Sequence, residues 1–153
     1  SALADLTGYR LMPAWHSDPQ APQQALSAEA PGWRQPLVID PAQPLGAVEC
    51  WAELLGAWRL PTCLLCSEAD RAAGLARSHW ALLRHYRVPL VGMIQWGGDW
   101  RPAERRAEGL PWLGHLPSSP ADPEALSELR LRLIRASGVA AAAPPAPAWM
   151  PSH

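Results

Sequence analysis

Asp40 is the acidic residue of this sequence that is best placed to do chemistry. It follows the short apolar run Leu37-Val38-Ile39 and precedes Pro41, so it stands at the end of a predicted strand. A carboxylate in that position can ligate Mg²⁺ when phosphate oxygens share the ion. An aspartate before a proline can also cap the turn with its own side chain. The sequence leaves both roles open.

Cysteine and histidine supply the other candidate groups. Cys63 and Cys66 have C-x-x-C spacing, but they lie in a predicted strand, where residues three apart point to opposite faces. Because a redox pair needs its reactive thiol at a helix N-terminus, core packing is the favoured role. His79, next to Ser78, lies on the apolar face of a predicted helix and is either a core side chain or a ligand contact. The histidines and cysteines do not have the spacing of a zinc site.

The composition excludes several kinds of chemistry. The chain of 153 residues has 13 basic residues, all arginine, against 14 acidic ones, and its net charge is -1. Without lysine it can form neither a lysine Schiff base nor a phosphate-binding loop of the G-x-x-x-x-G-K-[ST] kind. Neither a basic patch for nucleic acid nor an apolar run long enough to span a membrane is present. Three cysteines and a start unlike a signal peptide predict a reduced, cytoplasmic protein.

Three regions of the chain differ in composition. Residues 1–35 are rich in Pro, Gln and Ala, and we expect them to pack on or beside a core formed elsewhere. Residues 36–137 carry nearly all of the periodic apolar signal and are predicted to form one α/β domain. Residues 138–153 have the Pro- and Ala-rich composition of a disordered tail.

Short apolar runs alternate with helical patterns in the middle region. The runs predict four strands, at residues 37–39, 60–66, 88–94 and 110–116. Apolar residues at steps of three and four predict three helices, over residues 45–58, 68–87 and 122–138. Nearly continuous apolar strands that alternate with helices indicate a parallel sheet of at least four strands with helices on both faces.

Ligands of such sheets bind outside the carboxyl ends of the strands. The residues expected there are Asp40, 67–70, 95–99 and 117–119. Trp96 and Trp100 flank a predicted turn at Gly97-Gly98-Asp99, where they form a contact surface or a lid, or fold back on the sheet. The nearby arginines are interpreted as a solvated helix face, with phosphate pairing as the alternative: Arg101, Arg105 and Arg106.

The order of these elements and their end residues resembles the dethiobiotin synthetase family of nucleotide-dependent enzymes. The resemblance spans about residues 4–136 and rests on stretches at 4–19, 37–40, 51–62, 88–95 and 110–126. Val88–Gln95 is similar to the strand that ends in an adenine-reading Asn, and Leu110–Pro117 to the closing strand with an LG-x-LP signature. The resemblance implies a P-loop-NTPase-like core. The contacts it implies are Gln95, Leu116 and Pro117 for nucleotide, Ser78 and His79 for substrate, and Asp40 for metal.

The phosphate site is where the sequence departs from this family. The family has a P-loop with a lysine and a further catalytic lysine, whereas this chain contains no lysine. The Gly-rich loop after the acidic strand is replaced by Pro41-Ala42-Gln43-Pro44, which cannot wrap a phosphate with successive backbone N–H groups. We therefore expect no ATP hydrolysis by this chain alone, because phosphoryl transfer depends on positioning and charge stabilisation.

The expected function is that of a degenerate or partial family member that acts as a binding or regulatory subunit. One alternative is an ATP- and Mg²⁺-dependent ligase that closes a ureido ring in biotin biosynthesis, completed by another chain that supplies the P-loop. Another is an α/β protein-interaction scaffold with a Trp-rich contact loop. A homodimer or a partner chain is expected, because the missing N-terminal strand of the family would leave a sheet edge uncovered.

Overall fold

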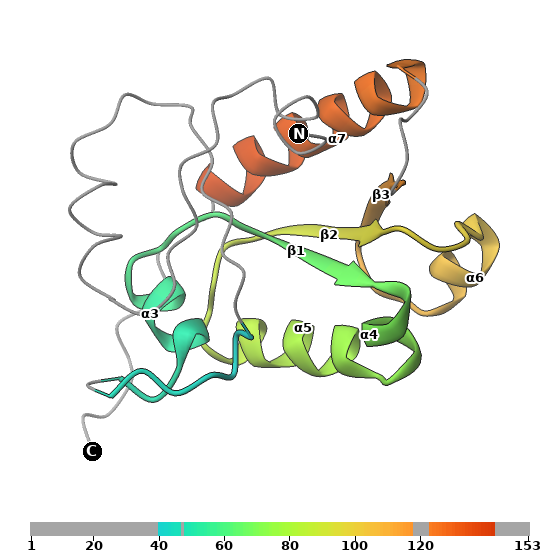
Figure 1. The fold of residues 1–153 in the computed structure, drawn as a ribbon. Helices are drawn as coiled ribbons and strands as arrows, with labels where there is room; N and C mark the ends of the chain where they lie inside the picture. Colours follow the sequence, from blue (N-terminus) through green and yellow to red (C-terminus); the bar gives the residue numbers. More distant parts are fainter. Residues whose placement is uncertain (1–39, 47, 118–122, 143–153) are drawn as a thin grey trace.

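The computed structural model describes residues 40–46, 48–117 and 123–142 (Figure 1). Its helices and strands alternate, which confirms the predicted α/β class. In chain order they are α3 (Trp51–Ala57), β1 (Thr62–Ser67), α4 (Glu68–Ala72), α5 (Leu75–His85), β2 (Leu90–Trp96), α6 (Pro102–Ala107), β3 (Trp112–Leu116) and α7 (Pro123–Ala142).

A parallel sheet of three strands, in the order β1-β2-β3, forms the centre of the described residues. The strands end together, because Trp96 pairs with Ser67 on one side and with Leu116 on the other. We call this end of the sheet its carboxyl edge. The fourth strand that the sequence predicts, at residues 37–39, lies outside the described residues, as does the region 1–35.

Helices cover both faces of the sheet, α7 on one and α3, α4 and α5 on the other (Figure 1). Met93 faces the core under α3 and α5, and its neighbour Ile94 faces the core under α7. Cys66 packs in the first of these cores and Cys63 against the second, so the prediction that the two point to opposite faces is confirmed.

The predicted helix over residues 68–87 is in fact two helices. Ser67 begins α4 with a capping box, in which its hydroxyl accepts from Asp70 N while the Asp70 carboxylate accepts from Ser67 N. Gly74 then adopts a left-handed conformation with φ of 79°, which ends the first helix before α5 begins at Leu75. The periodicity of apolar residues continues across this break, so it could not reveal it.

Three further boundaries differ from the prediction. The first helix begins at Trp51 and not near residue 45, because Leu45 and Val48 pair with each other in a tight antiparallel bridge. The helix α6 was anticipated only as the helix face that carries Arg101, Arg105 and Arg106, without bounds. The last helix, α7, continues to Ala142 through its predicted stop at Gly138, where a glycine costs a helix only about 1 kcal/mol.

The same kind of turn joins three helices to the strands that follow them. Arg59, Arg87 and Gly109 have φ of 55°, 56° and 69°, and each precedes an apolar residue and a proline. After α3 and α5, the amide of that apolar residue donates to the carbonyl oxygen five residues earlier, at 3.1 Å and 3.0 Å. This bond identifies a Schellman motif, a helix end that usually carries glycine where these two turns carry arginine.

Candidate functional site

Gln95, the penultimate residue of β2, is completely buried at the carboxyl edge. Its side-chain nitrogen Nε2 donates to Gly97 O at 2.8 Å and to Asp99 O at 3.1 Å, while its oxygen Oε1 accepts from Arg105 Nε at 2.8 Å. Both amide hydrogens of Gln95 are therefore used to hold the turn that follows its own strand.

That turn allows the backbone to approach the start of α4 closely. Gly97 and Gly98 have φ of 63° and 67°, a region that only glycine enters readily. A Cβ on Gly98 would lie 2.8 Å from Glu68 Cβ, so the position also has no room for a side chain. The sequence predicted this turn correctly, because two successive glycines and an aspartate follow an apolar run.

Arg105, in α6, is 2% exposed, and its side chain reaches Gln95 at the carboxyl edge and Glu68 at the start of α4. Besides its bond to Gln95, its guanidinium donates from Nη2 to Glu68 Oε2 at 3.0 Å and from Nη1 to Glu108 Oε1 at 3.2 Å. Nη2 also lies 3.5 Å from Asp99 O. The guanidinium carbon is 6.0 Å from the ring centroid of Trp100 and 5.9 Å from that of Trp112, close enough for cation–π attraction.

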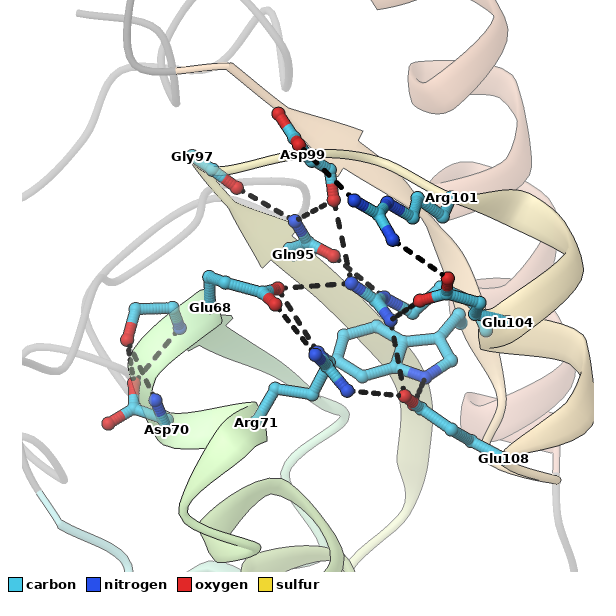
Figure 2. A network of polar contacts seen from close by, with 12 residues as sticks. Glu68, Asp70, Arg71, Gln95, Gly97, Asp99, Arg101, Glu104 and Glu108 are labelled. Carbon is cyan, nitrogen blue, oxygen red and sulfur yellow. Dashed lines mark hydrogen bonds and ion pairs between the residues drawn. The ribbon is translucent and has the colours of Figure 1, made fainter.

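A second arginine completes what we call the polar cluster, formed by Glu68, Arg71, Gln95, Arg105 and Glu108 (Figure 2). Arg71 in α4 donates to Glu68 Oε1 at 2.6 Å and to Glu108 Oε1 at 2.9 Å. The hydrogen bond from Arg71 lowers the pKa of Glu68 and raises the pKa of the Arg71 guanidinium. Two carboxylates and two guanidinium groups thus neutralise each other in the cluster.

The polar cluster corrects the prediction for one arginine. Arg105 was interpreted as part of a solvated helix face, and it is instead buried, whereas Arg101 and Arg106 are exposed as predicted. The partners of Arg105 come from α4 and β2 as well as from its own helix, so spacing along the sequence carried no signal for it. The one available hint was an arginine in a short segment that directly follows a predicted carboxyl-edge turn.

Asp40 and His79, two of the residues singled out from the sequence, lie together. Asp40 Oδ1 is 3.1 Å from His79 Nε2, and the same oxygen accepts from Ala42 N at 2.8 Å. The second contact is the turn cap predicted as one role of Asp40. Ser78 is exposed, and its hydroxyl donates back to Gly74 O within the helix. The substrate-contact roles of Ser78 and His79 stay predictions.

A metal site does not form around Asp40 in the part of the chain that the structure describes. Among those residues, no three His, Cys, Asp or Glu side chains come together in a way that could hold a metal ion. Magnesium shares its coordination sphere with phosphate oxygens, so the role of Asp40 as a magnesium ligand stays a prediction that depends on a bound nucleotide.

Leu116 and Pro117 follow one another at the end of β3. The Leu116 side chain is completely buried under α7, and its carbonyl oxygen accepts from Gly97 N at 2.9 Å. Pro117 is half-buried. The nucleotide-contact roles of Gln95, Leu116 and Pro117 stay predictions, and in the described structure the polar groups of Gln95 and Leu116 bind other parts of this chain.

The two tryptophans of the carboxyl-edge turn behave differently. Trp96 is 39% exposed at the end of β2. Trp100 folds back, with its ring stacked on His115 at a centroid distance of 6.0 Å and an interplanar angle of 10°. Of the two alternatives for this turn, Trp96 fits a contact surface and Trp100 fits the folded-back arrangement.

The thiols of Cys63 and Cys66 have low reactivity in this structure. Burial raises the pKa of both Cys63 and Cys66 to about 12; the neighbouring Cys66 thiol adds to the rise for Cys63, and the Asp70 carboxylate adds to the rise for Cys66. A thiol with such a pKa is protonated at neutral pH, whereas the thiolate is the form that reacts. This agrees with the core-packing role inferred from the sequence.

Comparison with models of known protein families, with curated proteins and with solved structures found no match. None of the helices in the described residues is both long and apolar enough to cross a bilayer.

Proposed function

We propose that this chain is a non-catalytic α/β binding module, a degenerate relative of the dethiobiotin synthetases that acts as a subunit or partner of another chain. The sequence supports the relationship through the order of its elements, and it argues against self-sufficient catalysis because it has no lysine. The resemblance to the dethiobiotin synthetases is the basis for the proposed ancestry. The proposed binding role is based on the contacts made at the carboxyl edge of the sheet.

The observation that carries this proposal is the occupation of the carboxyl edge by the chain's own side chains. Ligands of parallel sheets bind at this edge, and here Arg105 fills the place between α4 and the end of β2 while being 2% exposed. Both amide hydrogens of Gln95 are engaged inside the chain. A nucleotide base that needed Gln95 would have to break bonds that hold the turn, so nucleotide binding is disfavoured.

A thermal-shift titration with Mg-ATP, with and without the diamine substrate of the family, tests the proposal. We expect no rise in Tm and no phosphate release above a control without protein. A ligand at about 100 times its Kd would stabilise the chain by about 2.7 kcal/mol, so binding would be easy to see. A rise in Tm would overturn the proposal and favour the alternative, a ligase whose P-loop comes from another chain.

Association with a second copy or with a partner chain is the other part of the proposal. Trp96 supports it, because this large aromatic side chain is exposed beside a glycine turn, and tryptophan is typical of the centre of protein interfaces. Light scattering of the purified chain should give a mass above that of one chain, and Trp96→Ala should lower it while the circular-dichroism spectrum of the folded chain is retained. Trp58→Ala, a change of a partly buried tryptophan after α3, is the matched control. A monomer under all conditions would leave only a heterologous partner.

A further inference from the structure

The face of α7 that points away from the sheet carries exposed apolar side chains. Helix α7 covers one side of the sheet, and no other described helix lies against its outer face (Figure 1). Leu129 and Leu133 are buried against the sheet, whereas Leu131 and Ile134 are 54% and 44% exposed. These two are the most exposed of the large apolar side chains in the described residues. The outer face of a surface helix is normally polar, so this pair of side chains points to a contact.

The two apolar residues belong to a seam with the spacing of a helix pair. The seam consists of four exposed residues at steps of four, three and four: Ser127, Leu131, Ile134 and Gly138. This is the spacing of the contact positions in a coiled coil. The small residues at its two ends let a second helix approach closely, and a Cβ on Gly138 would meet nothing within 4 Å. The seam therefore has the shape to take one more helix, packed along α7.

The charges beside the seam are complementary to those of a second copy in the antiparallel direction. Glu128 and Arg135 lie on the same flank of the seam, about two helical turns apart. Among the described residues, Arg135 makes no hydrogen bond or ion pair, and Glu128, at 65% exposure, binds Arg132 of its own helix through Oε1 alone. In an antiparallel pair with its two-fold axis between Leu131 and Ile134, Glu128 of each copy meets Arg135 of the other.

The same charges disfavour the parallel direction. A parallel pair places Arg130, on the other flank of the seam, next to Arg135 of the second copy, and these like charges repel each other. In the antiparallel pair, Arg130 instead faces the uncharged Ser137 of the second copy. Because the apolar residues meet in both directions, the charges select the antiparallel one.

We infer that α7 is the surface through which this protein associates with itself, and that its occupant is α7 of a second copy, packed antiparallel about a two-fold axis. The inference rests on the association that forms part of the proposed function, and it names the partner and the surface. Trp96 lies on the same side of the sheet, because Ile94, two residues earlier in β2, packs under α7. One copy on this side of the sheet can therefore reach both α7 and Trp96.

Two charge reversals and their mixture test the pairing. In sedimentation equilibrium at low ionic strength, Glu128→Arg and Arg135→Glu should each raise the dimer Kd about tenfold, because each variant brings two pairs of like charges together. An equimolar mixture of the two variants should associate with about the Kd of the unmodified chain, since every charge in the mixed dimer again meets its opposite. Arg84→Glu is the matched control. This exposed arginine lies on α5, at the other face of the sheet, so the Kd should not change.

Leu131→Ser tests the apolar part of the seam. It should raise the dimer Kd about tenfold or more, because each dimer buries two copies of this side chain. The circular-dichroism spectrum should be retained, since Leu131 is exposed in the single chain.

Three results would overturn the inference: a monomer at all concentrations, a dimer that none of the three changes in α7 weakens, or a mixture that associates no better than its two components. A dimer that only Trp96→Ala weakens would also overturn it, but would leave the proposed function in place. The Mg-ATP titration decides separately whether the chain binds nucleotide.

Discussion

Replacement of Glu68 with glutamine removes one negative charge from the polar cluster and keeps the shape of the side chain. Glu68 uses both carboxylate oxygens: Oε1 accepts from Arg71 at 2.6 Å, and Oε2 accepts from Arg105 at 3.0 Å. A glutamine at this position has one carbonyl oxygen, so it can accept from one guanidinium, and its NH₂ group then faces the other. Arg105, at 2% exposure, would lose one of its two close carboxylates.

The loss in stability follows from how buried the partners are. Removal of one partner from a fully buried ion pair costs about 3–5 kcal/mol. Glu68 itself is 40% exposed, so water screens its charge, and Arg105 retains Glu108 and Gln95. We therefore expect Glu68→Gln to lower the free energy of unfolding by about 1–2 kcal/mol at pH 7.

The pH dependence gives this prediction a second readout. The hydrogen bond from Arg71 lowers the pKa of Glu68 from its ordinary value of 4.5 in the folded chain. A carboxyl with a lowered folded pKa stabilises the fold above its unfolded pKa, and that contribution is lost as the pH falls through the folded value. The difference between wild type and Glu68→Gln should therefore be constant near neutral pH and shrink below pH 4.5.

Urea unfolding followed by tryptophan fluorescence at several pH values measures both quantities. Glu104→Gln is the matched control, since Glu104 also contacts Arg105, but at 3.9 Å and with 52% exposure; its effect should be below about 0.5 kcal/mol. Equal losses for the two variants would refute the assignment of Glu68 to the buried cluster. A loss for Glu68→Gln that persists unchanged at pH 3 would show that shape, not charge, causes it.

Three other changes test the fold. Arg87→Gly should raise the free energy of unfolding by about 0.5–1 kcal/mol in urea, because it relieves a left-handed arginine with φ of 56°. Arg59→Gly should change it little, because the same relief is offset by the loss of a hydrogen bond from Arg59 Nη1 to Arg87 O at 2.8 Å. Gly92→Ala should lower the Tm, since φ is 151° and a Cβ would lie 2.6 Å from a leucine Cγ of β3; an unchanged Tm would contradict this packing. Cys63 and Cys66 should resist iodoacetamide at pH 8 in the folded chain and react in urea, because burial raises the pKa of both thiols to about 12; rapid labelling of the folded chain would argue against their burial.

The parts of the fold that sequence reasoning found are those with a local signal. The strands β1, β2 and β3 lie within two residues of their predicted positions, because each is an apolar run bounded by proline or glycine. Their parallel order followed from the alternation with helices. The break at Gly74 was missed, because the apolar spacing on either side fits one helix and the left-handed conformation of a single glycine is invisible in that spacing.

The sequence predicted where the candidate site lies, but it did not predict all of the residues that form it. The rule for parallel sheets placed ligands at the carboxyl edge and so led to Gln95, which is at the centre of the polar cluster. Arg105 was missed because its environment is tertiary: Glu68 lies 37 residues earlier, and the burial of a charged side chain requires partners that only the fold brings together. Charged residues are rarely buried unless paired, so a short polar helix was interpreted as solvated.

The chemistry of the polar cluster favours recognition over proton transfer. A general acid or base works best when its pKa is near the working pH. The hydrogen bond between Arg71 and Glu68 raises the pKa of the Arg71 guanidinium and lowers the pKa of the Glu68 carboxyl, so both pKa values move away from neutrality. The guanidinium and carboxylate groups of the polar cluster are thus fixed charges that pair with one another. Groups of fixed, complementary charge hold one another by geometry and donor pattern and are poorly suited to exchange protons at neutral pH.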